Sequence, residues 1–336
     1  MRGGVIMKLA LKIVGGLVLG LLVLIVGTYL ALRRPDIAFE TLEAQYANSA
    51  SRYLDLPDGV RVHYRDQGNP KGPVLVLVHG FSASLHTWEP WVQRLGDQYR
   101  IITLDLPGHG LTRAPATYVS STEKQVDVVA QTTDRLGLQG FVLGGNSMGG
   151  GVAWTFATLY PERLKGLALV NSVGLPRAQT NAKSPLAFKL LRYPLARALG
   201  QQLDTSALVA TGLKGAFYNK ALVDQAMIDR YVALGRAEGH RAIILNQQMG
   251  RKMRTEGEVR ALLGAFKMPV LVMHGQEDEI IPVAQGQALA AAIPGSTLIL
   301  YPKVGHIPME EVADKSATDL DEWLKEKGIG APERPI

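Results

Sequence analysis

The sequence contains no cysteine. This absence excludes disulfide bonds, a cysteine nucleophile, and zinc or iron–sulfur sites that depend on cysteine ligands. It does not identify the cellular compartment, since proteins on either side of a membrane fold without cysteine.

Long basic runs interleaved with aromatic residues are also missing, although the net charge is +6. Such runs mark nucleic-acid-binding surfaces, so nucleic acid is not expected as a partner. Hydrophobic residues make up 47% of the chain and charged residues 20%, which excludes general disorder and favours a globular protein with a large core.

Charge is absent from residues 13–32, which read IVGGLVLGLLVLIVGTYLAL. A helix rises about 1.5 Å per residue, so this run would span about 30 Å, the thickness of the hydrocarbon core of a bilayer. A signal peptide has a shorter apolar core of about 7–15 residues, and no small-x-small cleavage pattern follows. We therefore expect an uncleaved anchor at residues 1–34 that enters the membrane through residues 13–32. A signal peptide is the alternative.

The basic residues around this run give a weak topology signal. Arg2, Lys8 and Lys12 precede it, and Arg33 and Arg34 follow it. Positive charge favours the cytoplasmic side, so the slight N-terminal excess predicts that the chain after this run lies outside the cytoplasm, on the periplasmic side.

Short apolar runs alternate with helical patterns after a polar tether at residues 35–53. A hairpin with its turn at residues 57–59 comes first. Six buried-strand runs follow, at residues 73–80, 99–110, 140–150, 164–172, 269–282 and 296–302. The alternation predicts an α/β fold with a mainly parallel sheet flanked by helices.

The alternation is interrupted at residues 175–267, where only helical patterns occur. This insertion predicts a helical cap on a core made of residues 54–174 and 268–327, with residues 328–336 as a C-terminal tail. The cap has 15 Lys or Arg and 6 Asp or Glu, a net charge of +9. It is expected either to be a solvated lid or to face an anionic membrane surface, with a pocket beneath it covered by the apolar side chains of Leu186, Phe188, Leu190 and Leu191.

The stretch GGNSMGG, residues 144–150, places the pattern G-x-S-x-G between an apolar run and a helical pattern. Glycine this dense is unfavourable inside a strand or helix, because it loses the most conformational freedom on folding. At a sharp strand-to-helix turn, small residues let the backbones approach closely and leave the serine hydroxyl exposed. The pattern therefore predicts Ser147 as a nucleophile.

A serine hydroxyl needs a general base, and the base needs a carboxylate that sets its tautomer. His306 follows the last predicted strand, and Asp278 follows the strand before it. Ligands bind at the carboxyl ends of the strands in open α/β sheets, so both side chains are predicted to meet Ser147. Asp278 is preferred over its neighbour Glu277, and Asn171, at the end of another strand, cannot carry the charge.

An oxyanion in the transition state needs N–H donors. Met148, directly after the nucleophile, is predicted to supply one and Phe81, in the turn after the first apolar strand, the other. His79 in that turn is interpreted as a structural hydrogen-bonding residue. Four other histidines are interpreted as packing or surface residues: His63, His86, His240 and His274.

Five motifs together resemble the α/β-hydrolase superfamily over residues 54–327: HGFSASLHTWEPW, DLPGHGLT, GGNSMGG, HGQEDEIIP and VGHIPMEE. The chain looks most like bacterial esterases and lipases with a helical cap, some of which carry an N-terminal membrane segment. Haloalkane dehalogenases and epoxide hydrolases have an aspartate nucleophile where this chain has Ser147, so those classes are disfavoured.

The resemblance implies hydrolysis of small-molecule carboxylic esters, with short- to medium-chain or lipid-like acyl groups, through an acyl-enzyme. GNSMGG is also familiar from meta-cleavage-product hydrolases, which cut a carbon–carbon bond with the same triad. Their oxyanion turn usually has a glycine-rich HG-G form, whereas this chain has Phe81 after His79 and Gly80, which favours esters. A non-catalytic ligand-binding member of the fold and acyl transfer by the same site are further alternatives. No metal or organic cofactor is expected.

Overall fold

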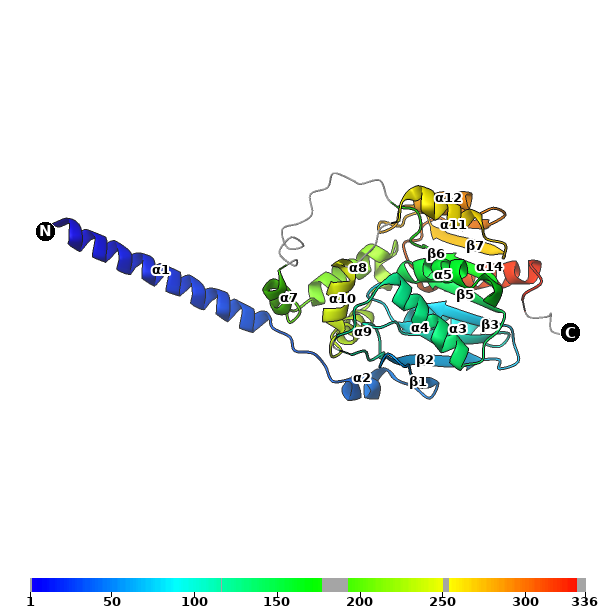
Figure 1. The fold of residues 1–336 in the computed structure, drawn as a ribbon, viewed down its shortest axis with the longest axis horizontal. Helices are drawn as coiled ribbons and strands as arrows, with labels where there is room; N and C mark the ends of the chain where they lie inside the picture. The colour runs from blue at the N-terminus through cyan, green and yellow to red at the C-terminus, as the bar shows by residue number, and fades with distance from the viewer. Residues whose placement is uncertain (1, 116, 177–192, 250–253, 331–336) are drawn as a thin grey trace.

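The computed structural model describes residues 2–115, 117–176, 193–249 and 254–330, in which an eight-stranded sheet lies between two layers of helices (Figure 1). The strands are β1 (Ser51–Asp55), β2 (Arg61–Gly68), β3 (Val74–Val78), β4 (Arg100–Leu104), β5 (Phe141–Asn146), β6 (Leu164–Val170), β7 (Val270–Gly275) and β8 (Thr297–Tyr301). Their order is β1-β2-β4-β3-β5-β6-β7-β8, and β2 is antiparallel to both neighbours while the other pairs are parallel. The predicted α/β fold with a mainly parallel sheet is confirmed.

Helices account for most of the connections between strands. They are α1 (Arg2–Leu32), α2 (Phe39–Tyr46), α3 (Glu89–Leu95), α4 (Thr122–Arg135), α5 (Met148–Leu159), α7 (Pro194–Gly200), α8 (Ser206–Ala216), α9 (Gln225–Gly235), α10 (His240–Met249), α11 (Glu256–Gly264), α12 (Val283–Ala292), α13 (Pro308–Glu311) and α14 (Ala313–Glu326), with 3-10 turns η1 (Leu85–Trp88), η2 (Pro161–Arg163) and η3 (Lys220–Leu222).

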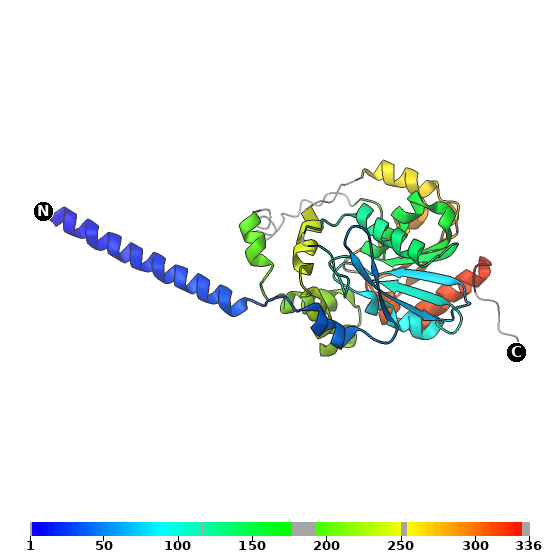
Figure 2. The ribbon, with the colours of Figure 1, turned by 60° about the horizontal axis from the view of Figure 1, so that its bottom comes forward.

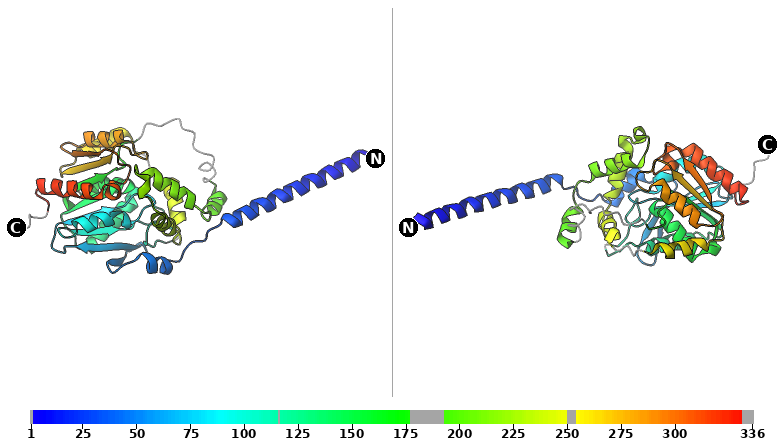
Figure 3. Two further views of the ribbon diagram at one scale, coloured as in Figure 1. Left: turned by 180° about the vertical axis from the view of Figure 1, so that it is seen from behind. Right: turned by 90° about the horizontal axis from the view of Figure 1, so that it is seen from above.

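The two faces of the sheet are both buried, as the continuous apolar runs predict. Val76 and Val78 of β3 pack in one cluster with α4, α5, α11 and α12, whereas Leu75 and Leu77 pack in the other with α3 and α14. Successive side chains of a strand point to opposite faces, so one run of apolar residues supplies both layers. Figure 3 shows these layers from behind and from above.

The helices α7 to α10 form a group at one end of the sheet (Figure 2). There the backbone N–H of His306 donates to the carbonyl of Ala216, the last residue of α8, at 2.6 Å. They correspond to the predicted cap. The four residues expected to cover an acyl pocket lie outside the described residues: Leu186, Phe188, Leu190 and Leu191.

The segment predicted as cap, residues 175–267, also includes α11, which packs elsewhere. Val259 and Leu263 of α11 are buried in the cluster formed with α5 and α12, beside the sheet. The apolar pattern of a helix shows that one face is buried but does not identify the layer that buries it, which is why the sequence placed α11 with the cap.

The helix α1 projects away from the rest of the protein, and its segment Leu11–Leu32 has a mean hydropathy of 2.5 and no buried residues (Figure 1). Within the described ranges it is the one helix long and apolar enough to cross a membrane. The segment after it, predicted as a tether at residues 35–53, contains α2 and the start of β1. Phe39 and Leu42 of α2 pack with Leu234 of the cap, and Asp36 pairs with Arg241 at 2.6 Å. This segment is therefore folded onto the cap.

Candidate active site

Ser147 lies at the junction between β5 and α5, on a strained turn. Its backbone has φ 54° and ψ −115°, a region that residues with a side chain rarely adopt. The surrounding backbone holds this conformation: Ser147 N–H donates to Val170 at 3.0 Å, and its carbonyl accepts from Gly151 and Val173, both at 3.1 Å. The turn presents Ser147 at the head of α5, as G-x-S-x-G predicts.

Gly149 allows the first turn of α5 to approach the end of β3. A Cβ atom at this position would lie 2.2 Å from the carbonyl oxygen of Val78 and 2.5 Å from that of His79. No side chain fits at those distances. The glycines around Ser147 therefore bring this residue and the turn after β3 together, which explains their density.

His306 and Asp278 form a direct pair at the same edge of the sheet. The carboxylate Oδ2 of Asp278 lies 2.7 Å from Nδ1 of His306, and both residues are buried. Within the described residues no hydrogen bond joins the Ser147 hydroxyl directly to the His306 ring. The backbone segments that carry them are linked through Asn146, the residue before Ser147, whose side-chain amide donates to the backbone carbonyl of His306 at 3.1 Å. In enzymes that use such a pair, the contact between serine and histidine often tightens only when substrate binds.

The Asp278 carboxylate is fully supplied with hydrogen-bond donors. Its Oδ1 accepts from the backbone N–H groups of Ile280 and Ile281 at 2.7 and 2.8 Å, and its Oδ2 accepts from His306 and from Asn171. Burial by itself raises the pKa of Asp278, but the contacts with His306 and Asn171 outweigh it, so the pKa lies below its ordinary value. The carboxylate therefore remains ionised beside the imidazole.

Asn171 has a part in the site that the sequence did not reveal. Its side-chain amide donates to Asp278 Oδ2 at 2.7 Å and to the Gly305 carbonyl at 3.2 Å, and its oxygen accepts from Gly275 N–H at 3.3 Å. Because it cannot carry a charge, the sequence excluded it as the acid. The structure places it as a support that joins the loops of Asp278 and His306.

The turn after β3 carries Phe81, and it lies against Ser147. A Cβ atom at Gly80 would be 3.2 Å from the Cβ of Ser147, which shows how closely the two segments approach. Leu106 N–H donates to His79 Nε2 at 3.0 Å, so the proton of the neutral ring is on Nδ1, which donates to the Gly80 carbonyl at 2.7 Å. Burial lowers the pKa of His79, which keeps the ring neutral. This agrees with the structural role interpreted for His79.

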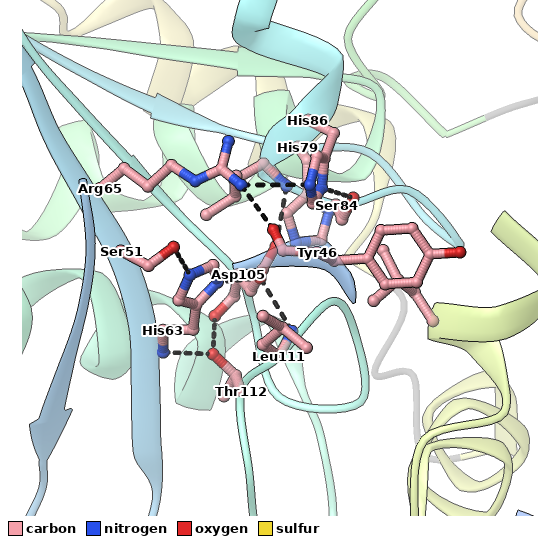
Figure 4. A network of polar contacts seen from close by, with 12 residues as sticks. Tyr46, Ser51, His63, Arg65, His79, Ser84, His86, Asp105, Leu111 and Thr112 are labelled. Atoms are coloured by element: carbon pink, nitrogen blue, oxygen red, sulfur yellow. Dashed lines mark hydrogen bonds and ion pairs between the residues drawn. The ribbon is translucent and has the colours of Figure 1, made fainter. Parts of the chain in front are cut away.

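A buried network centred on Asp105 joins the start of η1, which follows the turn that carries Phe81, to β2 and to Leu111 (Figure 4). Its Oδ1 accepts from Leu85 N–H at 2.7 Å, and its Oδ2 accepts from His63 Nδ1 at 2.7 Å and Leu111 N–H at 2.9 Å. Burial by itself raises the pKa of Asp105. The hydrogen bond from His63 and the electrostatic attraction of its ring outweigh this effect and keep the pKa well below its ordinary value. The motif DLPGHG, which begins at Asp105, therefore contacts both ends of the segment around Phe81, through Leu106 N–H to His79 and through Asp105 to Leu85 N–H.

The four histidines interpreted as packing or surface residues all lie in the interior. His63, His240 and His274 are fully buried, and His86 nearly so. Each makes hydrogen bonds, as His274 Nε2 does to the Ile281 carbonyl at 2.8 Å. In the described residues no cluster of three or more His, Asp or Glu side chains could hold a metal ion.

A polar cavity of about 530 Å³ lies apart from Ser147, between α2, α3 and α9. Arg65, His86, Glu89 and Arg230 are among its lining residues, and Arg65 pairs with Glu89 at 2.7 Å across it. None of the predicted site residues lines it.

Similar proteins carry the same architecture. A family model described as alpha/beta hydrolase fold matches residues 73–312. A pimeloyl-[acyl-carrier protein] methyl ester esterase of Nitrosomonas europaea is 31% identical over 77% of this chain and 98% of its own length. A 2-hydroxy-6-oxo-6-phenylhexa-2,4-dienoate hydrolase of Burkholderia cepacia is 28% identical over 76% of this chain and 87% of its own.

Among solved structures, a bacterial membrane phospholipase A superposes with a TM-score of 0.67 at 23% identity, covering 95% of this chain and 98% of its own. At that identity the likeness concerns the fold alone. The match to the family model and the similarity to the esterase show which family this is: this chain belongs to the α/β-hydrolase fold family.

Proposed function

We propose that this protein hydrolyses carboxylic esters through a Ser147–His306–Asp278 triad. The observation that carries the proposal is the buried 2.7 Å contact between Asp278 and His306 at the edge of the sheet where Ser147 occupies a strained turn. A serine, a histidine and a carboxylate brought together in this way are the elements of acyl transfer to a serine.

In this reaction the Ser147 hydroxyl oxygen attacks the ester carbonyl carbon while Nε2 of His306 accepts the proton. Asp278 keeps the His306 proton on Nδ1 and stabilises the imidazolium that forms. The backbone N–H groups of Phe81 and Met148 donate to the oxyanion. His306 then protonates the departing alcohol. A water molecule that gives a proton to His306 attacks the acyl-enzyme, and His306 returns this proton to the Ser147 oxygen as the acid leaves.

The substrate class proposed is a short- to medium-chain or lipid-like ester. The 31% identical esterase relative supports an ester bond as the target. Carbon–carbon bond hydrolysis is the second candidate, and the 28% identical dienoate hydrolase favours it. Phe81 after Gly80, in place of a glycine-rich turn, favours the ester.

The test is a panel of p-nitrophenyl esters of increasing acyl length, with a dienone acid of the meta-cleavage type as the competing substrate. Ester turnover that falls by several orders of magnitude in Ser147→Ala supports the proposal. Turnover of the dienone acid alone would select the second candidate. No turnover of either substrate by a folded protein would select a ligand-binding role, and full activity in Ser147→Ala would refute the triad.

We propose further that α1 is an uncleaved anchor that holds the catalytic domain outside the cytoplasm. The backbone directly after α1 is hydrogen-bonded to the cap. Arg33 forms an isolated antiparallel β-bridge with Leu203, and Arg34 N–H donates to the Gln202 carbonyl at 2.7 Å. Leu195 and Leu199 of the adjacent α7 are exposed by 72% and 44%, apolar surface that suits a membrane boundary.

Cell fractionation and protease protection test the anchor. The full chain is expected in the membrane fraction with its N-terminus intact, and deletion of residues 1–32 should give a soluble, folded protein. Cleavage after α1 in the mature protein would select the signal peptide. Protection of the domain from protease added to spheroplasts would place it in the cytoplasm.

A further inference from the structure

The loop that carries His306 is held by the cap as well as by the core. His306 N–H donates to the Ala216 carbonyl, the last residue of α8, at 2.6 Å. The Glu311 carboxylate accepts from Gly305 N–H at 2.7 Å, and from Asn219 and Tyr218 N–H at 2.6 and 3.3 Å. One carboxylate therefore binds the His306 loop to the chain that leaves α8.

The other end of α8 is bonded to the end of α1. Asp204, two residues before α8, accepts from Ser206 N–H at 2.9 Å through Oδ1 and pairs with Arg34 Nε at 3.1 Å through Oδ2. Its own N–H donates to the carbonyl of Leu32, the last residue of α1, at 2.8 Å. The start of α8 is thus attached where α1 ends.

The helix α8 joins these two attachments directly. Its 11 residues span about 16 Å as a helix. Leu213 and Ala216 are buried, so its C-terminal half is packed rather than free. A displacement of α1 relative to the cap would therefore act on the backbone of the His306 loop.

We propose that α8 couples the position of α1 to His306, with Glu311 as the positioning residue at the catalytic end and Asp204 as the attachment at the α1 end. This rests on the proposed role of His306 as general base. The rate of the chemical step then depends on how α1 is held, which gives a membrane-anchored hydrolase a means of responding to its anchor.

The Glu311→Gln variant tests the catalytic end. Glutamine has one acceptor oxygen in place of two, and its NH₂ group faces backbone donors, so the loop should loosen. Loss of hydrogen bonds to a charged group corresponds to a fall in kcat of about 10- to 100-fold, with KM changed by less than about threefold. Glu310→Gln, the same change at the adjacent residue, is the matched control and should keep kcat.

The Asp204→Asn variant tests the coupling in the full chain reconstituted in phospholipid vesicles. Asparagine keeps an oxygen for Ser206 N–H but loses the ion pair with Arg34. Because this ion pair is partly exposed to solvent, its loss is expected to lower kcat by about two- to fivefold. Asp224, which caps the next cap helix by accepting from Met227 N–H at 2.7 Å, provides the control Asp224→Asn.

Amide hydrogen exchange of Gly305 and His306 reports on the hydrogen bonds of this loop to Glu311 and Ala216 without any substrate. Exchange of both amides should rise in Glu311→Gln and, to a smaller extent, in Asp204→Asn, but not in the two controls. In the double variant, Asp204→Asn should add nothing to the kcat loss of Glu311→Gln, whereas distant independent sites would multiply. Unchanged exchange in Asp204→Asn, or multiplying effects, would overturn the coupling. Failure of the ester hydrolase proposal would appear separately, as activity that does not depend on Ser147.

Discussion

Replacement of Gly149 by alanine should disable the site without touching any group that takes part in the chemistry. The new Cβ would lie 2.2 Å from the Val78 carbonyl oxygen and 2.5 Å from that of His79. Both oxygens belong to the backbone, so relief requires a shift of about 1 Å between α5 and the turn that carries Phe81. A misplacement of that size costs about 100-fold in rate. We expect kcat for a p-nitrophenyl ester to fall by about that factor, and overpacking to destabilise the fold by about 1–3 kcal/mol.

Gly151→Ala is the matched control, in the same turn of α5. Its Cβ would meet a side-chain methyl, Cγ2 of Val173, at 2.5 Å, and this methyl can shift without moving the turn that carries Phe81. Its kcat should stay within about tenfold of wild type. Steady-state kinetics and thermal unfolding of both variants provide the comparison. A folded Gly149→Ala enzyme with wild-type kcat would refute the view that this glycine sets the distance between Ser147 and Phe81.

Three further predictions each concern a single residue. Asn171→Ala removes a donor from Asp278 and leaves the Gly275 N–H without its acceptor, so kcat should fall by about 10-fold or more; wild-type kinetics would deny Asn171 a supporting role. Burial raises the pKa of the Glu310 carboxyl group to about 7. The folded state therefore binds the carboxyl proton more tightly than the unfolded state does, and the free energy of unfolding falls as pH rises from about 5 to 7. Glu310→Gln should therefore raise the free energy of unfolding at pH 8, by up to about 3 kcal/mol, and change it little near pH 4.5; equal effects at both pH values would contradict this. Gly212 in α8 has no atom within 4 Å of its Cβ position, so Gly212→Ala should stabilise the protein by about 0.5–1 kcal/mol in thermal unfolding, and a lower melting temperature would show an unrecognised constraint.

The positions of the candidate triad could be predicted because each depends on a local pattern and one general rule. Ser147 is marked by a strand, a glycine-rich turn and a helix within a few residues. His306 and Asp278 are each marked by a preceding apolar run. The rule that parallel strands bring their carboxyl ends to one edge then predicts that the three meet.

Other features depend on which surfaces pack together. The polar segment around α2 looks like a tether, but Phe39 and Leu42 pack onto the cap. No pattern in the sequence of α11 shows whether this helix packs in the cap or beside the sheet. Glu311 is one of two adjacent glutamates, and only the structure shows its carboxylate on the N–H groups of Gly305 and Asn219.

The sequence by itself determined the fold class, the apolar N-terminal helix and the candidates Ser147, Asp278 and His306, because hydrophobic period, turn chemistry and strand-end position are properties of short segments. Tertiary structure alone decided that Asn171 supports Asp278, that Asp105 binds Leu85 N–H just after the turn that carries Phe81, and that α8 lies between α1 and the His306 loop. These are contacts between residues far apart in the chain, some more than 100 positions, as for Asn171 and Asp278. Their formation depends on how whole layers pack, and that is not encoded in any one segment.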